Sequence, residues 1–485
     1  SGTNAHVVLE EAPRQEVAAE APAATTRAAE LVVLSAKSPL ALEQAAGRLV
    51  THLEKYPEQA LGDVAYSLGT TRTHHEHRLA LSVRTRAELG EALIEAGRGE
   101  TPGCGVRGEV SGSRGKEAWL FTGQGSQEVG MGRGLYEAWP AFREALDSAW
   151  AALDAHLEFP LRSVMWAEAC SREAQLLDET SYTQPALFAF EWALSALWQS
   201  WGVKPDFVLG HSIGEVTAAC VAGVFSLADA SKLVAARGRL MQALPERGVM
   251  VSLGASEAEV LAGLPPDASD VSIATVNGPS SVVIAGLEAA VNRVAEAFGS
   301  RGVRTKRLKV SHAFHSALME PMLEEFARVA ESVSYRAPTL AVVSNRTGKV
   351  VGTELTHPAY WVEHVRQTVR FADGVKTLSA AGVDTFVEVG PKATLVSLVA
   401  ECTEGKETRL ISSLRAERGE VESVLLALGA QWAHGREVNW KGVFGESCRR
   451  VELPTYPWQR ERYWIEAAPA RARAGEATGH PLLGV

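Results

Sequence analysis

Residues 206–224 read DFVLGHSIGEVTAACVAGV, and they give the clearest indication of the fold. The apolar residues 206–210 predict a strand, and the small residues 215–224 predict a helix directly after it. Between them lies a Gly-x-Ser-x-Gly turn centred on Ser212, where glycine permits a bend that a Cβ would obstruct. The pattern predicts a nucleophile elbow, with a helix N-terminus beneath it that could stabilise an oxyanion. The alternative is a plain structural turn.

Strands and helices alternate around this turn, which predicts a parallel α/β sheet. Residues 248–310 interrupt that order with a β-α-β-β-α-β succession, typical of a ferredoxin-like unit. The predicted fold is therefore an α/β-hydrolase-like large subdomain with a parallel sheet, an inserted ferredoxin-like subdomain and a small N-terminal α/β domain. The predicted boundaries are 1–30 for a tail and tether, 31–113 for the small domain, 114–247 and 311–412 for the large subdomain, 248–310 for the insert, 413–465 for a segment that ends rich in proline and aromatics, and 466–485 for a further, truncated stretch.

The composition is that of an ordinary globular chain. Of 485 residues, 58 are acidic and 48 are Lys or Arg; the net charge is −10 and no long basic block occurs, which argues against a nucleic-acid binder. The five cysteines are scattered without a Cys-x-x-Cys, so neither a disulfide framework nor a thiolate metal site is expected. No apolar run reaches membrane-spanning length and no signal peptide is recognisable, which favours a cytoplasmic protein without membrane contact.

A nucleophilic serine needs a base, and two histidines compete for that role. His312 and His315 lie close together directly after the insert. The residues alone do not choose between them. A backbone carbonyl could orient the base. The acidic side chains that could do so instead are Asp267, Asp270 and Glu320.

Arg237 is predicted to face the protein interior. A capping-box-like start at 226–229 opens a helix, and the residues three and four positions from Arg237 are all apolar: Leu233, Val234, Leu240 and Met241. A buried guanidinium needs an anionic partner, and its planar fork fits a carboxylate. Two alternatives stay open: a structural ion pair with a buried Asp or Glu, and a substrate that carries a free carboxylate.

Two further motifs give weaker signals. The loop 121–127, FTGQGSQ, lacks the Lys-Ser/Thr of a phosphate-binding loop, but a backbone amide there could stabilise an oxyanion. The run at 74–77, HHEH, contains side chains that can bind a metal ion, yet no third ligand with the usual spacing lies nearby. We therefore expect no metal site.

Seven motifs occur together and in order: FTGQGSQ at 121–127, TQPALF at 183–188, GHSIGE at 210–215, RGRLMQ at 237–242, NGP at 277–279, SHAFH at 311–315 and VEVGP at 387–391. With them the chain resembles the acyltransferase domain of a bacterial modular type I polyketide synthase, over nearly its whole length. The resemblance implies that the chain begins with the end of a ketosynthase domain and a tether. It also implies a ketosynthase–acyltransferase linker at 31–113, a post-acyltransferase linker at 413–465 and the start of a dehydratase-like domain at 466–485.

The same resemblance implies a ping-pong transfer with a role for each site residue. An acyl-CoA would acylate Ser212, with His315 as general base and the backbone carbonyl of Gln367 orienting that base. The amides of Gln124 and Ile213 would form the oxyanion hole. No covalently bound cofactor is implied, and the substrate would be malonyl-CoA. The acyl group would pass to the phosphopantetheine thiol of an acyl carrier protein, and the adjacent ketosynthase and dehydratase-like domains would be the other partners.

The choice of extender unit is implied by smaller features. Arg237 would hold the free carboxylate of the unit. His312 and Phe314 stand where methylmalonyl-selective relatives carry Tyr and Ser, and Ile213 stands where they tend to carry Gln; the sequence YTQP at 182–185 also favours malonyl. Phe314 would fill the space of an α-methyl, which is worth about 1–3 kcal/mol of discrimination. The alternatives are a methylmalonyl-selective transferase, a serine hydrolase or thioesterase with a proofreading role, and a catalytically silent scaffold.

Overall fold

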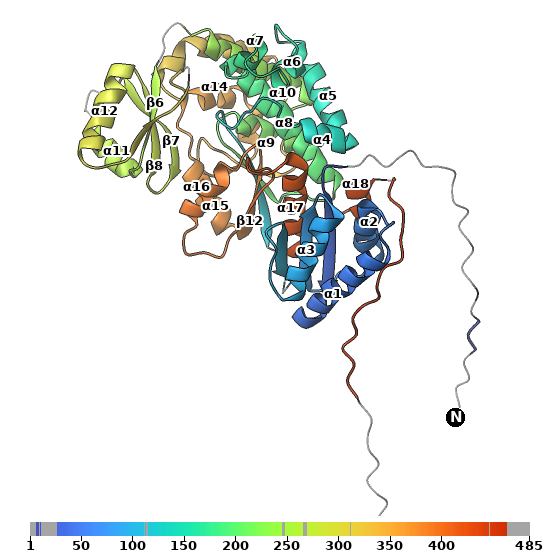
Figure 1. Cartoon of the computed structure of the whole chain (residues 1–485). Helices are drawn as coiled ribbons and strands as arrows, with labels where there is room; N and C mark the ends of the chain where they lie inside the picture. The colour runs from blue at the N-terminus through green and yellow to red at the C-terminus, as the bar shows by residue number, and fades with distance from the viewer. Residues whose placement is uncertain are drawn as a thin grey trace, which may run out of the picture.

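Three β-sheets and the helices packed on them build the described chain (Figure 1). The computed structural model describes residues 6–8, 10, 27–110, 112, 115–244, 248–264, 269–310, 312–445 and 447–462. One sheet belongs to the N-terminal domain, one to the large subdomain and one to the insert. The predicted fold class is confirmed.

The N-terminal domain is a three-stranded antiparallel sheet with helices packed on it. Its strands lie in the order β1 (Glu30–Ala36), β2 (His77–Val83) and β3 (Gly105–Glu109), and its helices are α1 (Pro39–Lys55), α2 (Leu61–Thr71) and α3 (Arg86–Gly97). Helix α1 begins where the Ser38 side chain accepts the Ala41 N–H, and Pro39 suits the first turn because its ring presets φ.

The large subdomain contains the six-stranded sheet that carries the elbow. Its order is β11 (Val350–Val351), β10 (Ala341–Val343), β5 (Phe207–Gly210), β4 (Lys116–Phe121), β12 (Val383–Val389) and β13 (Arg409–Ser412). All neighbours pair in parallel except the edge strand β11. Strand β5 lies inside the sheet, between β10 and β4. Ser212 follows its carboxyl end and therefore lies at the edge where parallel sheets usually bind their ligands.

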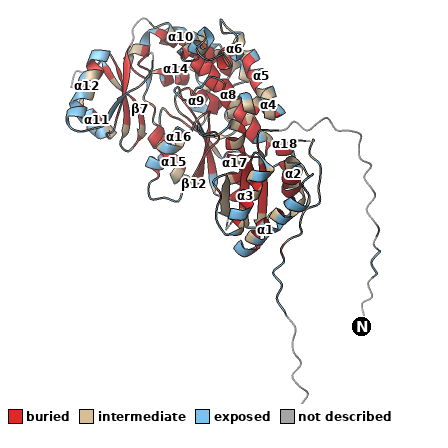
Figure 2. Cartoon of the chain, viewed as in Figure 1, coloured by how far each residue is buried: buried red, intermediate tan, exposed pale blue. Residues whose placement is uncertain are grey.

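Helices cover both faces of this sheet, and alternate residues of β4 belong to the two cores. Trp119 and Phe121 lie in the larger apolar cluster with residues of α8, whereas Ala118 and Leu120 lie in a smaller cluster with residues of α15 and α16. Figure 2 shows dense burial along α8, α9 and α10. The helices from α4 to α18, apart from the two of the insert, are α4 (Arg133–Ala138), α5 (Pro140–Asp154), α6 (Leu161–Met165), α7 (Arg172–Leu176), α8 (Thr180–Ser200), α9 (Gly214–Val221), α10 (Leu227–Gln242), α13 (Leu323–Glu331), α14 (Pro358–Arg366), α15 (Phe371–Ala380), α16 (Leu395–Cys402), α17 (Glu420–Ala433) and α18 (Trp440–Phe444), with short 3-10 turns η1 (Ala317–Met322) and η2 (Thr353–Thr356).

The insert forms its own antiparallel sheet with two helices packed against it (Figure 1). Its elements follow the predicted order: β6 (Val249–Leu253), α11 (Glu257–Gly263), β7 (Val271–Gly278), β8 (Ser281–Gly286), α12 (Glu288–Ser300) and β9 (Thr305–Arg307). The strands lie in the order β7-β8-β6-β9, and every neighbouring pair is antiparallel. The ferredoxin-like prediction is confirmed.

The chain after the large subdomain returns to the N-terminal domain. Helix α17 packs on that domain's sheet so closely that a Cβ at Gly429 would lie 2.7 Å from the Cβ of Ala80. Residues 447–462 then run without helix or strand along the N-terminal domain, where Arg72 Nη2 donates to the Leu453 carbonyl at 3.0 Å.

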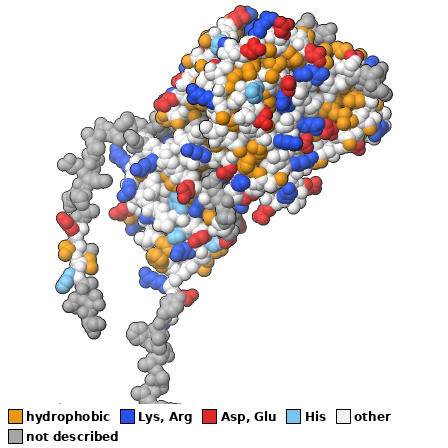
Figure 3. Space-filling view, turned by 180° about the vertical axis from the view of Figure 1, so that it is seen from behind, with side chains coloured by type: hydrophobic (Ala, Val, Ile, Leu, Met, Phe, Trp, Pro, Cys, Tyr) orange, Lys and Arg blue, Asp and Glu red, His pale blue; other side chains and the backbone are white. Residues whose placement is uncertain are grey.

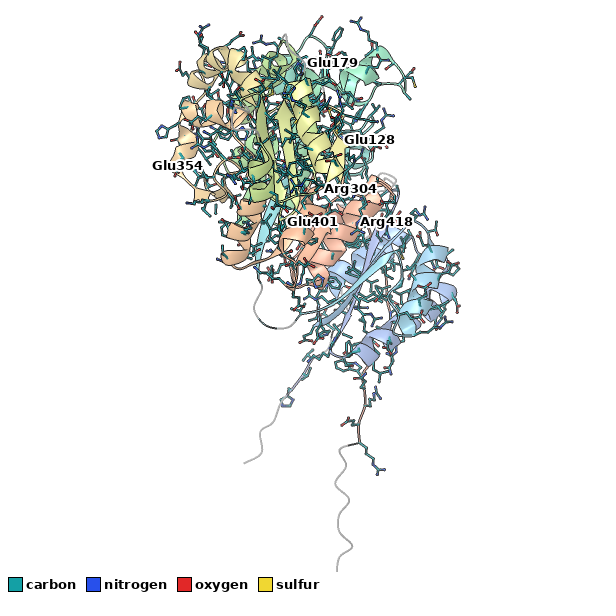
Figure 4. All side chains as sticks on the ribbon, turned by 90° about the vertical axis from the view of Figure 1, so that its left-hand side faces the viewer. Glu128, Glu179, Arg304, Glu354, Glu401 and Arg418 are labelled. Atoms are coloured by element: carbon teal, nitrogen blue, oxygen red, sulfur yellow. The ribbon has the colours of Figure 1, made fainter. Side chains whose placement is uncertain are left out.

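A buried ion pair joins the central sheet to the chain after α17. Arg436 Nη2 lies 2.6 Å from Glu117 Oε2 on β4, and both side chains are buried. Trp119 Nε1 donates to the same carboxylate at 2.8 Å. Nearer the surface, Arg418, labelled in Figure 4, donates to the Gly103 carbonyl at 2.7 Å. The ion pair thus holds the chain after α17 against the central sheet, and the Arg418 contact links the chain just before α17 to the N-terminal domain.

Charges of both signs are mixed over the surface. Figure 3 shows Lys and Arg side chains interspersed with Asp and Glu on the face opposite to that of Figure 1. In the insert, for example, Arg307 pairs with Glu288 at 2.5 Å, and both side chains are exposed. Within the described residues, the helices are all too short or too polar to span a bilayer.

Candidate active site

Ser212 lies on a tight turn between β5 and α9. Its φ of 52° falls in the left-handed region, which costs a non-glycine residue about 1–3 kcal/mol. A Cβ at Gly210 would lie 2.0 Å from the amide nitrogen of Glu215, and one at Gly214 would lie 2.3 Å from the Phe121 carbonyl oxygen. Glycine is therefore required at both flanking positions, because backbone packs directly on backbone.

His315 contacts this serine. Its Nε2 lies 2.8 Å from Ser212 Oγ, and its Nδ1 lies 2.8 Å from the carbonyl oxygen of Gln367 at the end of α14. A carbonyl only accepts, so Nδ1 carries the proton and Nε2 accepts the hydroxyl hydrogen. Burial, and next the charge of Arg237, lowers the pKa of His315 to about 3. The ring is therefore neutral near pH 7 and able to take a proton from the serine.

The other candidates for the base and its orienting group do not take the positions of His315 and of the Gln367 carbonyl. His312 is buried beside Phe314, with 6.2 Å between the ring centroids. The group on Nδ1 of His315 is a backbone carbonyl rather than an acid. Of the acidic candidates, Glu320 pairs with Arg366 at 3.2 Å, Asp270 is exposed, and Asp267 lies outside the described residues.

Arg237 projects from α10 toward the serine, on the inward face that the helical spacing predicts. Its side chain is 2% exposed, and Nη2 lies 3.2 Å from Ser212 Oγ. In the part of the chain that the structure describes, its Nε has no hydrogen-bond partner and no carboxylate pairs with the guanidinium. Burial lowers the pKa of Arg237 to about 9. The structural ion pair left open by the sequence is thus not found among these residues, and an anionic ligand would supply the missing partner.

The glycine-rich loop after β4 packs against the elbow. A Cβ at Gly123 would lie 3.0 Å from the carbonyl oxygen of His211. The side chain of Gln124 is held by α8, because its Oε1 accepts Gln184 Nε2 at 3.0 Å. Among the described residues, the backbone N–H groups of Gln124 and Ile213 donate no backbone hydrogen bond. Both amides are therefore available to an oxyanion.

The residues that the resemblance links to extender choice are all buried. Ile213, His312 and Phe314 are 1%, 3% and 7% exposed. The neighbouring Ala313 is packed so tightly against Gly248 that a Cβ added to this glycine would lie 2.6 Å from the Cβ of Ala313. Side chains in such surroundings cannot move aside without repacking, so their volumes limit what fits beside them.

Sequence reasoning missed a buried glutamic acid beside the site. Glu191 on α8 accepts the Thr122 N–H at 2.7 Å, the Thr122 hydroxyl at 2.6 Å and the Thr217 hydroxyl at 2.9 Å. It thereby joins the loop after β4 to α8 and α9. Burial raises the pKa of Glu191 to about 8. The available signal was a lone acid in the apolar run FAFEWAL at 188–194.

A second missed network holds the elbow from the other side. Glu215 Oε2 accepts the Asn345 N–H at 2.8 Å, and the Tyr360 hydroxyl donates to the same carboxylate. Asn345 Nδ2 donates to the carbonyls of Gly210 and Ser212 at 3.2 and 3.5 Å. The left-handed backbone at the serine is thus tied to a buried acid. The signal was the acidic residue that ends GHSIGE.

His211, the residue before the serine, connects the elbow to the insert. Its Nε2 lies 2.9 Å from Asn277 Oδ1 on β7. Burial lowers the pKa of His211, so the ring is neutral and its Nε2–H donates to the amide oxygen. In the sequence the NGP motif contributes only to the family resemblance, whereas in the structure its first residue marks a place where the two subdomains meet.

The histidine run at 74–77 lies at the entry to β2. His74 Nδ1 accepts Trp432 Nε1 at 2.9 Å, and its ring packs edge-on against Trp432 and Trp440. Burial lowers the pKa of His74 to about 4. Within the described residues, no group of three or more metal-ligating side chains is assembled. His74 is therefore part of the apolar packing.

Two family models match the chain. The acyl transferase domain model matches residues 118–438, and the model described as CurL-like, PKS C-terminal matches residues 30–93. The polyketide synthase GfsA of Streptomyces halstedii is 50% identical over 503 residues, which cover 100% of this chain and 7% of that protein. The chain thus spans less than a tenth of the length of this curated relative.

Solved structures agree with the family models. The acyltransferase domain from the second module of the salinomycin polyketide synthase is 46% identical, with a TM-score of 0.72 over 85% of this chain and 95% of that one. A malonyl-CoA:acyl carrier protein transacylase of Xanthomonas oryzae is 32% identical, with a TM-score of 0.57 over 63% of this chain and 96% of that one. A serine elbow on an α/β sheet with an inserted ferredoxin-like unit is thus the architecture of an acyl-transfer enzyme. The chain belongs to the acyl transferase domain family.

Proposed function

We propose that this domain transfers a malonyl unit from malonyl-CoA to the phosphopantetheine thiol of an acyl carrier protein during polyketide synthesis. The observation that carries the proposal is the buried guanidinium of Arg237, without an anionic partner among the described residues and 3.2 Å from the Oγ of Ser212. An acyl group that ends in a carboxylate would supply the partner while its thioester carbon meets the serine. A hydrolase of neutral acyl chains would gain nothing from this charge.

In the first half-reaction, Ser212 Oγ attacks the thioester carbon and its proton passes to His315 Nε2. The amides of Gln124 and Ile213 stabilise the oxyanion of the tetrahedral intermediate. The C–S bond then breaks, and CoA leaves as a thiol with the proton from His315. The hydrogen bond from Nδ1 to the Gln367 carbonyl keeps the ring in the required tautomer during both transfers.

The second half-reaction repeats these steps in reverse. The carrier thiol gives its proton to His315 and attacks the malonyl ester, and Ser212 leaves with that proton. The intermediate is held on the protein itself, so the transfer needs no bound cofactor. Phosphopantetheine belongs to the carrier protein.

Selection of malonyl over methylmalonyl is part of the proposal. Phe314 and His312 are buried in the segment that carries the base, and a phenyl ring takes up volume that a serine would leave for an α-methyl. The expected discrimination is about 1–3 kcal/mol, so some methylmalonyl transfer remains. The similarity to a bacterial malonyl-CoA transacylase supports the same choice.

We also propose that residues 31–113 and 413–465 are linkers between this domain and its neighbours in a cytoplasmic synthase. The match of residues 30–93 to the CurL-like model supports the first linker. The contacts of residues 447–462 with the N-terminal domain support the second, since they return the chain to that domain. A ketosynthase would precede the chain and a dehydratase-like domain would follow it.

Competitive labelling tests the proposal. The purified chain is mixed with equal concentrations of malonyl-, methylmalonyl- and acetyl-CoA, and the adduct is identified by intact mass. We expect mainly a malonyl adduct, absent from Ser212→Ala, that discharges faster to a phosphopantetheinylated carrier protein than to water. Equal acetyl and malonyl labelling, or discharge to water as fast as to the carrier, would contradict the proposed function.

A further inference from the structure

The orientation of His315 depends on the backbone at the end of α14. Its Nδ1–H donates to the carbonyl oxygen of Gln367 at 2.8 Å. Gln367 is itself exposed and ends the helix in an extended conformation, with φ −80° and ψ 157°. The position of a carbonyl oxygen is fixed by the contacts of the backbone segment that carries it. The residues that follow α14 therefore decide how firmly the imidazole is held.

The chain directly after α14 joins the sheet of the insert. Val369 N–H donates to the Ala274 carbonyl, and Val276 N–H donates to the Val369 carbonyl, each at 2.8 Å. Thr368 Oγ1 donates to the Ile273 carbonyl at 2.6 Å. These residues lie parallel to β7, which is the edge strand of its sheet. A short piece of the large subdomain thus extends the sheet of the insert.

Arg370 ties the end of this piece to both subdomains. Its Nη1 lies 2.8 Å from Glu257 Oε2 in the first turn of α11, and 3.4 Å from Asp373 Oδ2 in α15. Its backbone N–H donates to the carbonyl of Asn345 at 2.5 Å. Asn345 is the residue whose side chain reaches the Ser212 carbonyl. One segment is therefore bonded to the insert, to the base and to the support of the elbow.

We propose that Thr368 and Arg370 are positioning residues for the general base, and that the docked insert sets the geometry between His315 and Ser212. The inference rests on the proposed function, in which His315 is the base. Proton transfer needs about 2.6–3.2 Å between the heavy atoms, so a small displacement of the Gln367 carbonyl would turn the ring away from the serine. The insert then contributes to the rate of acylation and not only to the binding of cargo.

The reactivity of Ser212 toward a fluorophosphonate probe tests this inference without acyl-CoA. The full chain is treated with the probe, and the adduct is followed by intact mass in Thr368→Val and Arg370→Gln. We expect both variants to react on the order of tenfold more slowly, short of the about 100-fold that a 1 Å misplacement can cost. Arg370→Lys keeps the charge near Glu257 and should recover most of the rate. With malonyl-CoA, kcat should fall by a similar factor while KM stays within about twofold.

Matched variants separate positioning from stability. Glu288→Gln breaks the exposed pair with Arg307 elsewhere in the insert and should leave the probe rate unchanged. Glu257→Gln combined with Arg370→Gln should be scarcely slower than Arg370→Gln alone, because the two residues act through one contact. Wild-type probe rates in the positioning variants, or losses that only follow the fraction unfolded in urea, would overturn the inference. A wild-type Ser212 that reacts with the probe but takes no malonyl group would instead refute the proposed function.

Discussion

Replacing Arg237 by methionine removes its charge and leaves a shorter, unbranched apolar side chain. Burial lowers the pKa of Arg237 from 12.5 to about 9. At about 1.4 kcal/mol for each tenfold change in acidity, that difference corresponds to ~5 kcal/mol against keeping the charge buried without an anion. We therefore expect Arg237→Met to leave the free energy of unfolding unchanged or to raise it, although the residue is 2% exposed.

The same substitution should remove most of the preference for malonyl groups. A carboxylate held by the guanidinium fork would accept two charge-assisted hydrogen bonds, each worth about 1.5–3 kcal/mol. Their loss corresponds to about 3–6 kcal/mol, or roughly a 10²- to 10⁴-fold lower kcat/KM for malonyl-CoA. The kcat/KM for acetyl-CoA should change little, because acetyl has no carboxylate to lose.

Two measurements on one preparation check both expectations. Competitive acylation with malonyl- and acetyl-CoA gives the selectivity, and urea unfolding gives the stability. Arg239→Ala is the matched control, because Arg239 lies on the same helix, is exposed and pairs with Glu325 at 3.0 Å. It should change neither quantity by much. A variant at Arg237 that keeps full malonyl preference, or that loses several kcal/mol of stability, would refute the reasoning, since the second result would mean that the charge serves the fold.

Three further predictions follow from individual contacts. Because the pKa of His315 is about 3, the base is neutral above that value, and kcat/KM for acylation should not fall between pH 8 and 5 through protonation of this residue. The stability that the neutral ring contributes is present above pH 6.5 and is lost as the pH falls toward 3. Urea unfolding at several pH values would measure this loss. Arg436→Met leaves Glu117 buried without its charged partner and should cost about 3–5 kcal/mol in urea unfolding; a loss below about 1 kcal/mol would contradict the role of this pair. His312→Tyr combined with Phe314→Ser should raise methylmalonyl relative to malonyl labelling by roughly 10- to 200-fold, and an unchanged ratio would mean that these side chains do not limit the cargo.

Much of the fold could be predicted because its signals are local. The strand and helix around GHSIG, and the order of elements in the insert, follow from apolar periodicity and from glycine at the turn. Strand β3 gave no such signal, since GVRGE at 105–109 is weakly apolar and is held by pairing with β2. The supporting acids Glu191 and Glu215 were missed because a lone buried carboxylate has no periodic pattern, and its partners come from distant elements.

The spacing of neighbouring residues was enough to predict a serine on a tight turn between a strand and a helix, and to predict that Arg237 faces inward. The residues alone left His312 and His315 open and the family resemblance implied His315; the tertiary structure places His315 against the serine, 103 positions away in the chain. It alone brought the residues after α14 onto the sheet of the insert, and left the guanidinium without a carboxylate among the described residues. These contacts join segments that are far apart in the chain, and the spacing of neighbouring residues does not predict them.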